Sequence, residues 1–226
     1  MDHTAPPFNR LPPVVWILAL PIIAMEMVVS LGATGLVGPP EAIGWRLDAV
    51  QRFAFSPDYL RQMWEANLWP WGGLMRIVSY PLVHGNFTHA IFVIVFLLAL
   101  GKFVGDVFRW WAVLAVWFGA TIVGAVVYAA VPFVTLPLIG GYPPVYGLIG
   151  AFTFLLWTNL ALTGGNPYRA FTLIGMLLAI QLLFGLLFGG GDEWVADLAG
   201  FAAGFLLSFV VSPGGWAAVR AKIRQR

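Results

Sequence analysis

Long apolar runs, separated by short polar or glycine- and proline-rich stretches, dominate the chain. Six of these runs have about the 20 residues that a helix needs to cross a hydrocarbon core of about 30 Å. The pattern therefore predicts an all-α polytopic membrane protein, with a single membrane domain over residues 1–226, a long first loop at 36–87 and a basic tail at 213–226. The predicted membrane-spanning helices are 14–35, 88–105, 110–131, 144–162, 169–189 and 194–212.

Composition agrees with this fold class. Hydrophobic residues make up 60% of the 226 residues and charged residues 10%, whereas soluble domains have about 45–50% and about 25%. The chain has no cysteine, which excludes disulfides, thiol catalysis and cysteine-ligated metals. Its net charge of +2 comes from cations scattered at predicted helix ends, so we expect membrane lipids and no nucleic acid as partners.

The lysine and arginine distribution predicts the orientation. Eight of the twelve lie at the termini and around the second-to-third and fourth-to-fifth connections: Arg10, Lys102, Arg109, Arg169, Arg220, Lys222, Arg224 and Arg226. The other four lie in the first loop: Arg46, Arg52, Arg61 and Arg76. By the positive-inside rule we expect both termini in the cytoplasm, and a bacterial inner membrane as the location.

The first loop is not a plain solvated linker. Its segment "GWRLDAVQRFAFSPDYLRQMWEANLWPWGGLMR" is dense in tryptophan, phenylalanine, tyrosine and arginine. Such a mixture is typical of a segment that lies in the membrane interface. A contact surface for a substrate or partner is the alternative, and the two can hold together.

A few polar residues fall inside or beside the apolar runs. His84 and His89 are five residues apart, not the four that place two ligands on one helix face, so we expect no metal and no cofactor. Glu26 and Asp197 are acids within predicted spans, where such groups have a polar partner, are neutral, or take part in ion, proton or ligand binding. The spacing of Ala196, Gly200 and Gly204 predicts a close helix-packing face.

Three segments carry a family resemblance. "MRIVSYPLVHGNFTHAIF" at 75–92, "GGYPPVYGLIGAF" at 140–152 and "DEWVADLAGFAAGFLLSF" at 192–209 resemble, in order and spacing, signature segments of the rhomboid intramembrane serine proteases. The resemblance covers about residues 14–212. It implies a rhomboid-like bundle of six transmembrane helices with a fourth helix that begins at membrane depth.

The resemblance also implies roles for single positions. Arg76 matches the arginine of a tryptophan–arginine pair, although Met75 replaces the tryptophan. His84 and His89 match a histidine pair, the second of which helps to hold an oxyanion. Val93 stands where the family has an asparagine that donates to the same oxyanion, and valine offers no donor.

Both members of the catalytic dyad are replaced under the same resemblance. Tyr142 occupies the serine position and Asp197 the histidine position, with no serine between residues 132 and 160. Pro143 and Pro144 remove backbone N–H groups from the start of the fourth helix. We therefore read the chain as a pseudoprotease, and we expect the Tyr142 hydroxyl to donate a hydrogen bond to Asp197.

Four functions remain open on the sequence. The first is a non-catalytic protein that binds transmembrane segments of other integral membrane proteins and affects their assembly, stability or turnover. The second is a structural subunit of a larger membrane complex. The third is an active rhomboid-type intramembrane peptidase, as a domain match would suggest. The fourth is transport, which rests only on the intramembrane acids and the histidines.

Overall fold

The computed structural model describes residues 10–35, 37–188 and 191–214. The predicted basic tail lies outside the described residues from position 215 onward. Every named element in the described part of the chain is a helix: α1 (Pro13–Ala33), η1 (Pro40–Gly44), α2 (Trp45–Phe53), α3 (Pro57–Glu65), α4 (Trp71–Ser79), η2 (Tyr80–Leu82), α5 (Phe87–Gly105), α6 (Trp110–Ala130), α7 (Tyr142–Leu162), η3 (Pro167–Phe171), α8 (Thr172–Phe188) and α9 (Trp194–Val211).

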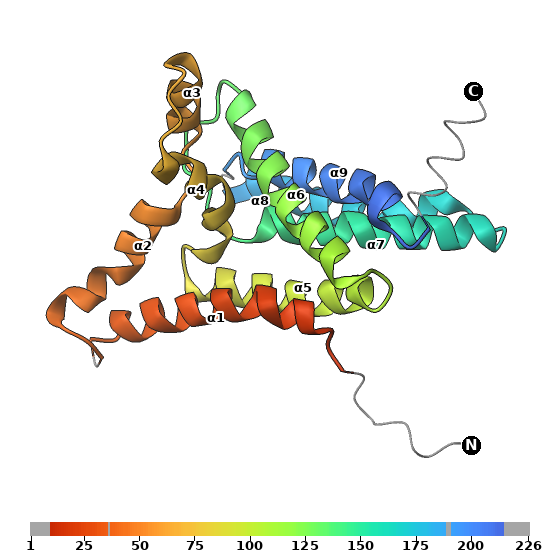
Figure 1. Ribbon diagram of the computed structural model, residues 1–226, viewed down its shortest axis with the longest axis horizontal. Helices are drawn as coiled ribbons and strands as arrows, with labels where there is room; N and C mark the ends of the chain where they lie inside the picture. The colour runs from red at the N-terminus through yellow and green to blue at the C-terminus, as the bar shows by residue number, and fades with distance from the viewer. Residues whose placement is uncertain (1–9, 36, 189–190, 215–226) are drawn as a thin grey trace.

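Five helices are long and apolar enough to cross a membrane, namely α1, α5, α6, α7 and α9. The remaining predicted span, 169–189, corresponds to part of η3 followed by α8, whose 17 residues are at the lower end of the transmembrane range. The ribbon shows these helices running back and forth between two ends of the bundle (Figure 1). The start of α1 and the end of α9 lie at the same end, opposite the first loop.

The bundle is tightest where α7 crosses α9. A Cβ placed on Gly200 would collide with the backbone of Pro143, and one on Gly204 with the backbone of Gly147. Glycines on both helices therefore allow backbone-to-backbone contact, as small residues do between membrane helices. This confirms the packing face that was predicted from the spacing of the small residues on α9, and it fixes the start of α7 against the first half of α9.

The first loop folds into η1, α2, α3, α4 and η2. Antiparallel backbone hydrogen bonds join it to the α6–α7 connection, from Phe55 N–H to the Leu138 carbonyl at 3.0 Å and from Leu138 N–H to the Phe55 carbonyl at 2.8 Å. Arg61 donates to the carbonyls of Ala129 and Val131 near the end of α6. These hydrogen bonds hold the first loop against the end of α6 and the α6–α7 connection.

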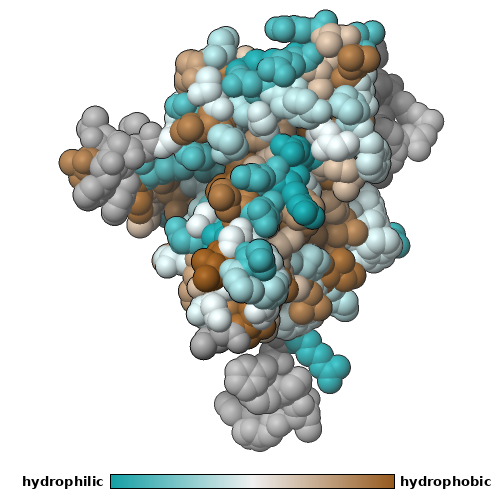
Figure 2. All heavy atoms as spheres, turned by 90° about the vertical axis from the view of Figure 1, so that its left-hand side faces the viewer, coloured by the Kyte–Doolittle hydropathy of each residue, from teal (hydrophilic) through white to brown (hydrophobic). Residues whose placement is uncertain are grey.

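The surface of the first loop is mixed in character. Figure 2, which looks onto the left-hand side of Figure 1, shows hydrophilic and hydrophobic residues interspersed on the face near α2 and α3. Trp64 is 75% exposed and Trp71 is 74% exposed. Exposed indole rings among polar groups are typical of segments at the membrane interface.

Candidate functional site

Residues from three chain segments meet at the start of α7. His84 lies between η2 and α5, and His89 is in the first turn of α5. Their rings contact edge to face, with centroids 4.9 Å apart and planes at 90°. The ring of Tyr142 then stacks on His89, at 4.9 Å and 15°. The structure thus brings His84, His89 and Tyr142 together, and Val93 packs beside them against Gly141.

Local backbone features explain this meeting. The side chain of Asn86 accepts a hydrogen bond from the His89 N–H at 2.9 Å, which caps the first turn of α5. Gly140 has a φ of +90°, and the His89 ring lies directly against its Cα, where a Cβ would collide. A residue with a side chain would be strained there and would displace His89. This is the physical reason for the glycine at position 140.

His84 is a buried, neutral imidazole. Its Nε2 accepts a hydrogen bond from the Gly141 N–H at 3.3 Å, so the ring proton is on Nδ1. Burial, together with the neighbouring His89, lowers the pKa of His84 to about 4. Among the described residues, no group of three or more histidine and carboxylate side chains could hold a metal ion.

Asp197 does not bond to Tyr142, so that expectation was wrong. Its Oδ2 accepts a hydrogen bond from Gln181 Nε2 of α8 at 2.9 Å. The Gln181 Oε1 in turn accepts from the Tyr146 hydroxyl of α7 at 3.3 Å. The ring of Tyr142 stacks on the imidazole of His89.

Gln181 and Tyr146 are site residues that the sequence reasoning missed. Gln181 is the sole side-chain amide in the predicted span 169–189, and polar side chains within membrane helices tend to pair across helices. Comparing its depth with that of Asp197 would have suggested the contact. Tyr146 lies one turn after Tyr142, on the same face of α7.

A cavity of about 270 Å³ lies beside this network. Four helices contribute to its walls: α5 through Phe96, α7 through Tyr142, Val145, Tyr146 and Ile149, α8 through Leu177, Ile180 and Gln181, and α9 through Asp197. The cavity is therefore mainly apolar, with a few polar groups on one side, which is the composition of a binding site for an apolar group with one polar feature.

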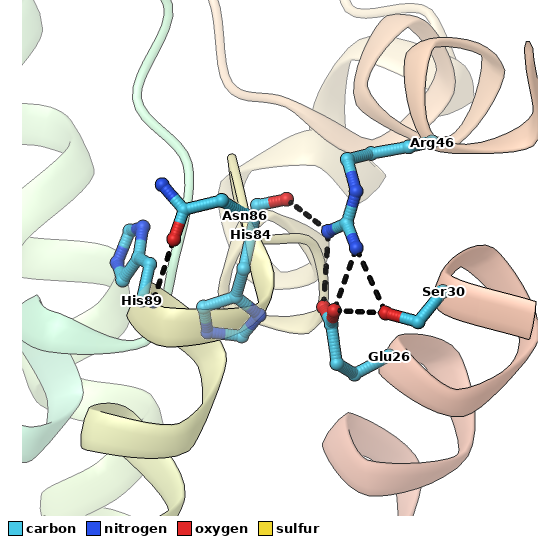
Figure 3. Close-up of polar contacts among 6 residues, drawn as sticks. All are labelled: Glu26, Ser30, Arg46, His84, Asn86 and His89. Carbon is cyan, nitrogen blue, oxygen red and sulfur yellow. Dashed lines mark hydrogen bonds and ion pairs between the residues drawn. The ribbon is translucent and has the colours of Figure 1, made fainter. Parts of the chain in front are cut away.

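A second polar cluster joins α1 to the first loop, as Figure 3 shows. Arg46 of α2 forms a two-pronged ion pair with Glu26 of α1, with N–O distances of 2.6 and 3.1 Å. Ser30 donates to Glu26 at 2.7 Å, and Arg46 also donates to the His84 carbonyl at 2.9 Å. Of the alternatives given for Glu26, the structure thus shows a polar partner, and the contact supports the segment that carries His84.

Arg76 is not part of the group around Tyr142. Its guanidinium donates to the Gln51 carbonyl at 2.8 Å and so links α4 to α2 within the first loop. Of the positions singled out by the resemblance, the structure separates Arg76 from the rest. His84, His89, Val93 and Tyr142 lie together, and Tyr142 and Asp197 line the same cavity.

A family model for the Rhomboid domain matches residues 72–214, which is more than half of the chain. The chain belongs to the rhomboid family. No curated protein matches it. The family match begins in α4 and runs through α9, so α1 and most of the first loop lie outside it. The rhomboid membership inferred from the three signature segments is confirmed.

Within this rhomboid framework, the described residues show no hydrogen bond between the Tyr142 hydroxyl and a general base. Catalysis by a hydroxyl needs a general base within hydrogen-bond reach, about 2.6–3.2 Å. His89 meets Tyr142 face to face, with the ring planes at 15°. Asp197 is engaged by Gln181. What the geometry offers is a shaped, largely apolar cavity with a fixed carboxylate.

Proposed function

We propose that this rhomboid-family protein is a pseudoprotease that binds the transmembrane segments of other membrane proteins and affects their assembly, stability or turnover. The observation that carries the proposal is the contact between Gln181 and Asp197. Asp197, at the family's histidine position, accepts a hydrogen bond from the Gln181 amide of α8. Tyr142, at the serine position, stacks on His89.

The chemistry of the neighbouring positions supports the same conclusion. A phenol with an ordinary pKa near 10 is a poor acyl-transfer nucleophile without a base. Val93 has no group that can donate to an oxyanion, and one such donor contributes about 100- to 1000-fold in rate. Pro143 and Pro144 lack the backbone N–H groups that a helix start otherwise offers to an anion.

The proposal includes a six-span rhomboid topology, with both termini in the cytoplasm and the first loop in the outer interface. Two observations support it. The start of α1 and the end of α9 lie at one end of the bundle. The cations outside the first loop gather at the ends expected to be cytoplasmic. A binding role then uses the cavity between α5, α7, α8 and α9, which lies among the membrane helices.

The test of the non-catalytic part is direct. The purified protein is reconstituted in liposomes with a panel of transmembrane substrates and, separately, incubated with a serine-directed fluorophosphonate. An active rhomboid protease serves as the positive control. We expect no cleavage and no labelling. Reproducible cleavage that is lost in Tyr142→Phe would establish the peptidase alternative instead.

The binding part is tested by crosslinking in native membranes, followed by affinity purification and mass spectrometry. Several substoichiometric integral membrane proteins are the expected result for a protein that binds transmembrane segments. One stoichiometric partner retained in mild detergent would favour the structural-subunit alternative, for which the exposed Trp64 and Trp71 would be contact residues.

A further inference from the structure

A groove lies between α3 of the first loop and the end of α6. Its volume is about 320 Å³, and its walls include Arg61, Trp64 and Glu65 from α3 and Val126 and Ala130 from α6. Figure 1 shows α3 beside this end of α6. Ala130 is the last residue of α6, and Val126 lies about 6 Å deeper along the helix. The groove therefore starts where the membrane helices reach the interface and runs towards the hydrocarbon core.

Arg61 places a fixed cation at the groove. Its guanidinium donates hydrogen bonds to four acceptors, namely the carbonyls of Ala129, Val131 and Val134 and the carboxylate of Asp58. These bonds leave one of the five guanidinium N–H groups without a partner in the described part of the chain. The side chain is 26% exposed, so a ligand in the groove can approach its charge.

Glu65 adds a negative charge that nothing in the described part of the chain balances. It is exposed, is the last residue of α3, and takes part in none of the ion pairs of the described residues. The last turn of α3 contains no basic residue, and the helix dipole disfavours an acid at this end. Glu65 lies one turn after Arg61 on the same face of the helix. The groove therefore presents a bonded cation and an unbonded carboxylate one turn apart.

Aromatic and aliphatic side chains complete the groove. Trp64 is 75% exposed, and the ring of Trp69 contacts it edge to face with centroids 5.7 Å apart. Indole rings favour the membrane interface and attract cations to their faces. On α6, Val126 is 46% exposed and Ile122, one turn deeper, is 42% exposed. An apolar track therefore continues from the groove along α6.

We propose that this groove binds a phospholipid whose headgroup joins a phosphate to a primary ammonium, as in phosphatidylethanolamine. The ammonium pairs with Glu65, the phosphate lies near Arg61, and the acyl chains follow Val126 and Ile122 along α6. The ethylene linker of the headgroup lets its two charges reach side chains that lie one turn apart. This lipid site is independent of the proposed function, because it lies between α3 and α6 and not at the cavity beside Tyr142.

Charge complementarity selects this occupant. Arg61 and Asp58 balance one another, so Glu65 leaves the groove with one negative charge in excess. A primary ammonium neutralises that charge and donates hydrogen bonds, whereas a trimethylated ammonium has no N–H group to donate. An anionic lipid without an ammonium group places a second negative charge beside Glu65. A transmembrane helix is about 10–12 Å wide and is too large for the groove.

The experiment uses the full chain, purified in detergent and incubated with equal amounts of phosphatidylethanolamine and phosphatidylglycerol that have identical acyl chains. Native mass spectrometry measures the ratio of the two lipids among the complexes that carry one lipid. We expect this ratio to fall about fivefold in Glu65→Gln, which is the size expected for one partly exposed ion pair. Glu65→Lys is expected to lower the ratio further, because the groove then has cations on both sides.

Two further variants locate the site. Glu41→Gln is the matched control, because Glu41 is another exposed acid of the first loop, in η1, and does not line the groove. It is expected to leave the ratio unchanged. Ala130→Phe fills the groove from α6 without altering a charge. It is expected to lower the fraction of the protein that carries phosphatidylethanolamine.

The outcomes are decisive in both directions. A ratio that stays the same in Glu65→Gln, or that falls equally in Glu41→Gln, overturns the lipid site. Unchanged phosphatidylethanolamine binding in Ala130→Phe also overturns it, and if that variant does not fold, the Glu65 variants still decide. Glu65 is exposed, so its variants are expected to fold, which thermal unfolding verifies. None of these results bears on the cleavage and crosslinking tests of the proposed function.

Discussion

The ring of Tyr142 lies almost parallel to the imidazole of His89, with ring centroids 4.9 Å apart. The contact joins the first residue of α7 to the first turn of α5. It shows that the tyrosine is held there by its aromatic face. The contact is made by the aromatic ring and does not involve the hydroxyl group.

The first prediction follows from that stack. Tyr142→Phe is expected to change stability by less than about 0.5 kcal/mol, because the ring contact remains. Tyr142→Ala is expected to lower the free energy of unfolding by about 3 kcal/mol, since it removes the stacked ring and leaves a space next to His89. Denaturation of the purified protein in mixed micelles measures both. Equal losses for the two variants would show that the hydroxyl carries the interaction.

A second prediction concerns restored chemistry. The double variant Tyr142→Ser with Asp197→His is expected to cleave at least about 100-fold more slowly than an active rhomboid protease on the same substrate, because Val93 supplies no oxyanion donor. Adding Val93→Asn is expected to raise the rate. The rate of product formation in liposomes is the measurement. A double variant as fast as the active enzyme contradicts the role given to Val93.

The third prediction tests the contact between α7 and α9. Gly204→Ala is expected to destabilise by about 1–3 kcal/mol, because its Cβ would collide with the Gly147 backbone. The control is Gly175→Ala on α8, where a Cβ meets nothing within 4 Å. That change is expected to be neutral or stabilising, since alanine favours helix by up to about 1 kcal/mol over glycine. Equal unfolding midpoints for the two variants would refute the close packing.

The fourth prediction concerns the ion pair of Glu26 and Arg46. Arg46→Leu is expected to cost about 3 kcal/mol, because it leaves a buried carboxylate without its cation. Combining it with Glu26→Leu is expected to cost less than Arg46→Leu alone. Lys102→Ala, which breaks the more exposed pair with Asp106, serves as the control and is expected to cost less than about 1 kcal/mol. Additive losses in the double variant would contradict a coupled pair.

The fifth prediction concerns orientation. Because the chain has no cysteine, single cysteines can be introduced and labelled one at a time. A cysteine at Trp71 in the first loop is expected to react with a membrane-impermeant maleimide in intact cells. A cysteine at Arg10 is expected to react only after the membrane is opened. The reverse pattern would invert the topology.

The fold was largely predictable because its elements follow from local patterns. The apolar runs placed the helix boundaries of α1, α5, α6, α7 and α9 within about two residues, since hydrophobic length and helix breakers are encoded locally. The glycine spacing on α9 likewise predicted its packing face, because close contact between two helix backbones requires small residues at a regular spacing, and that spacing can be read in the sequence.

The site was predictable only in part, because its polar contacts join distant segments. Asp197 was singled out, but its partner Gln181 lies on another helix, and nothing local relates the two residues. The same holds for Arg46, which counted only as a topology signal and turned out to pair with Glu26. Motif alignment placed Tyr142 at the family's serine position. Whether its ring or its hydroxyl makes the main contact depends on where His89 lies in space, which the motif does not specify.

The Glu26–Arg46 pair has a consequence for how the protein is made. Glu26 lies past the middle of α1 and is synthesised before its cation, so α1 has to enter the bilayer with an acid that as yet has no partner. Arg46 follows only 20 residues later. The pair can therefore form while the rest of the chain is still emerging, so α1 and the start of the first loop can associate before the later helices pack against them.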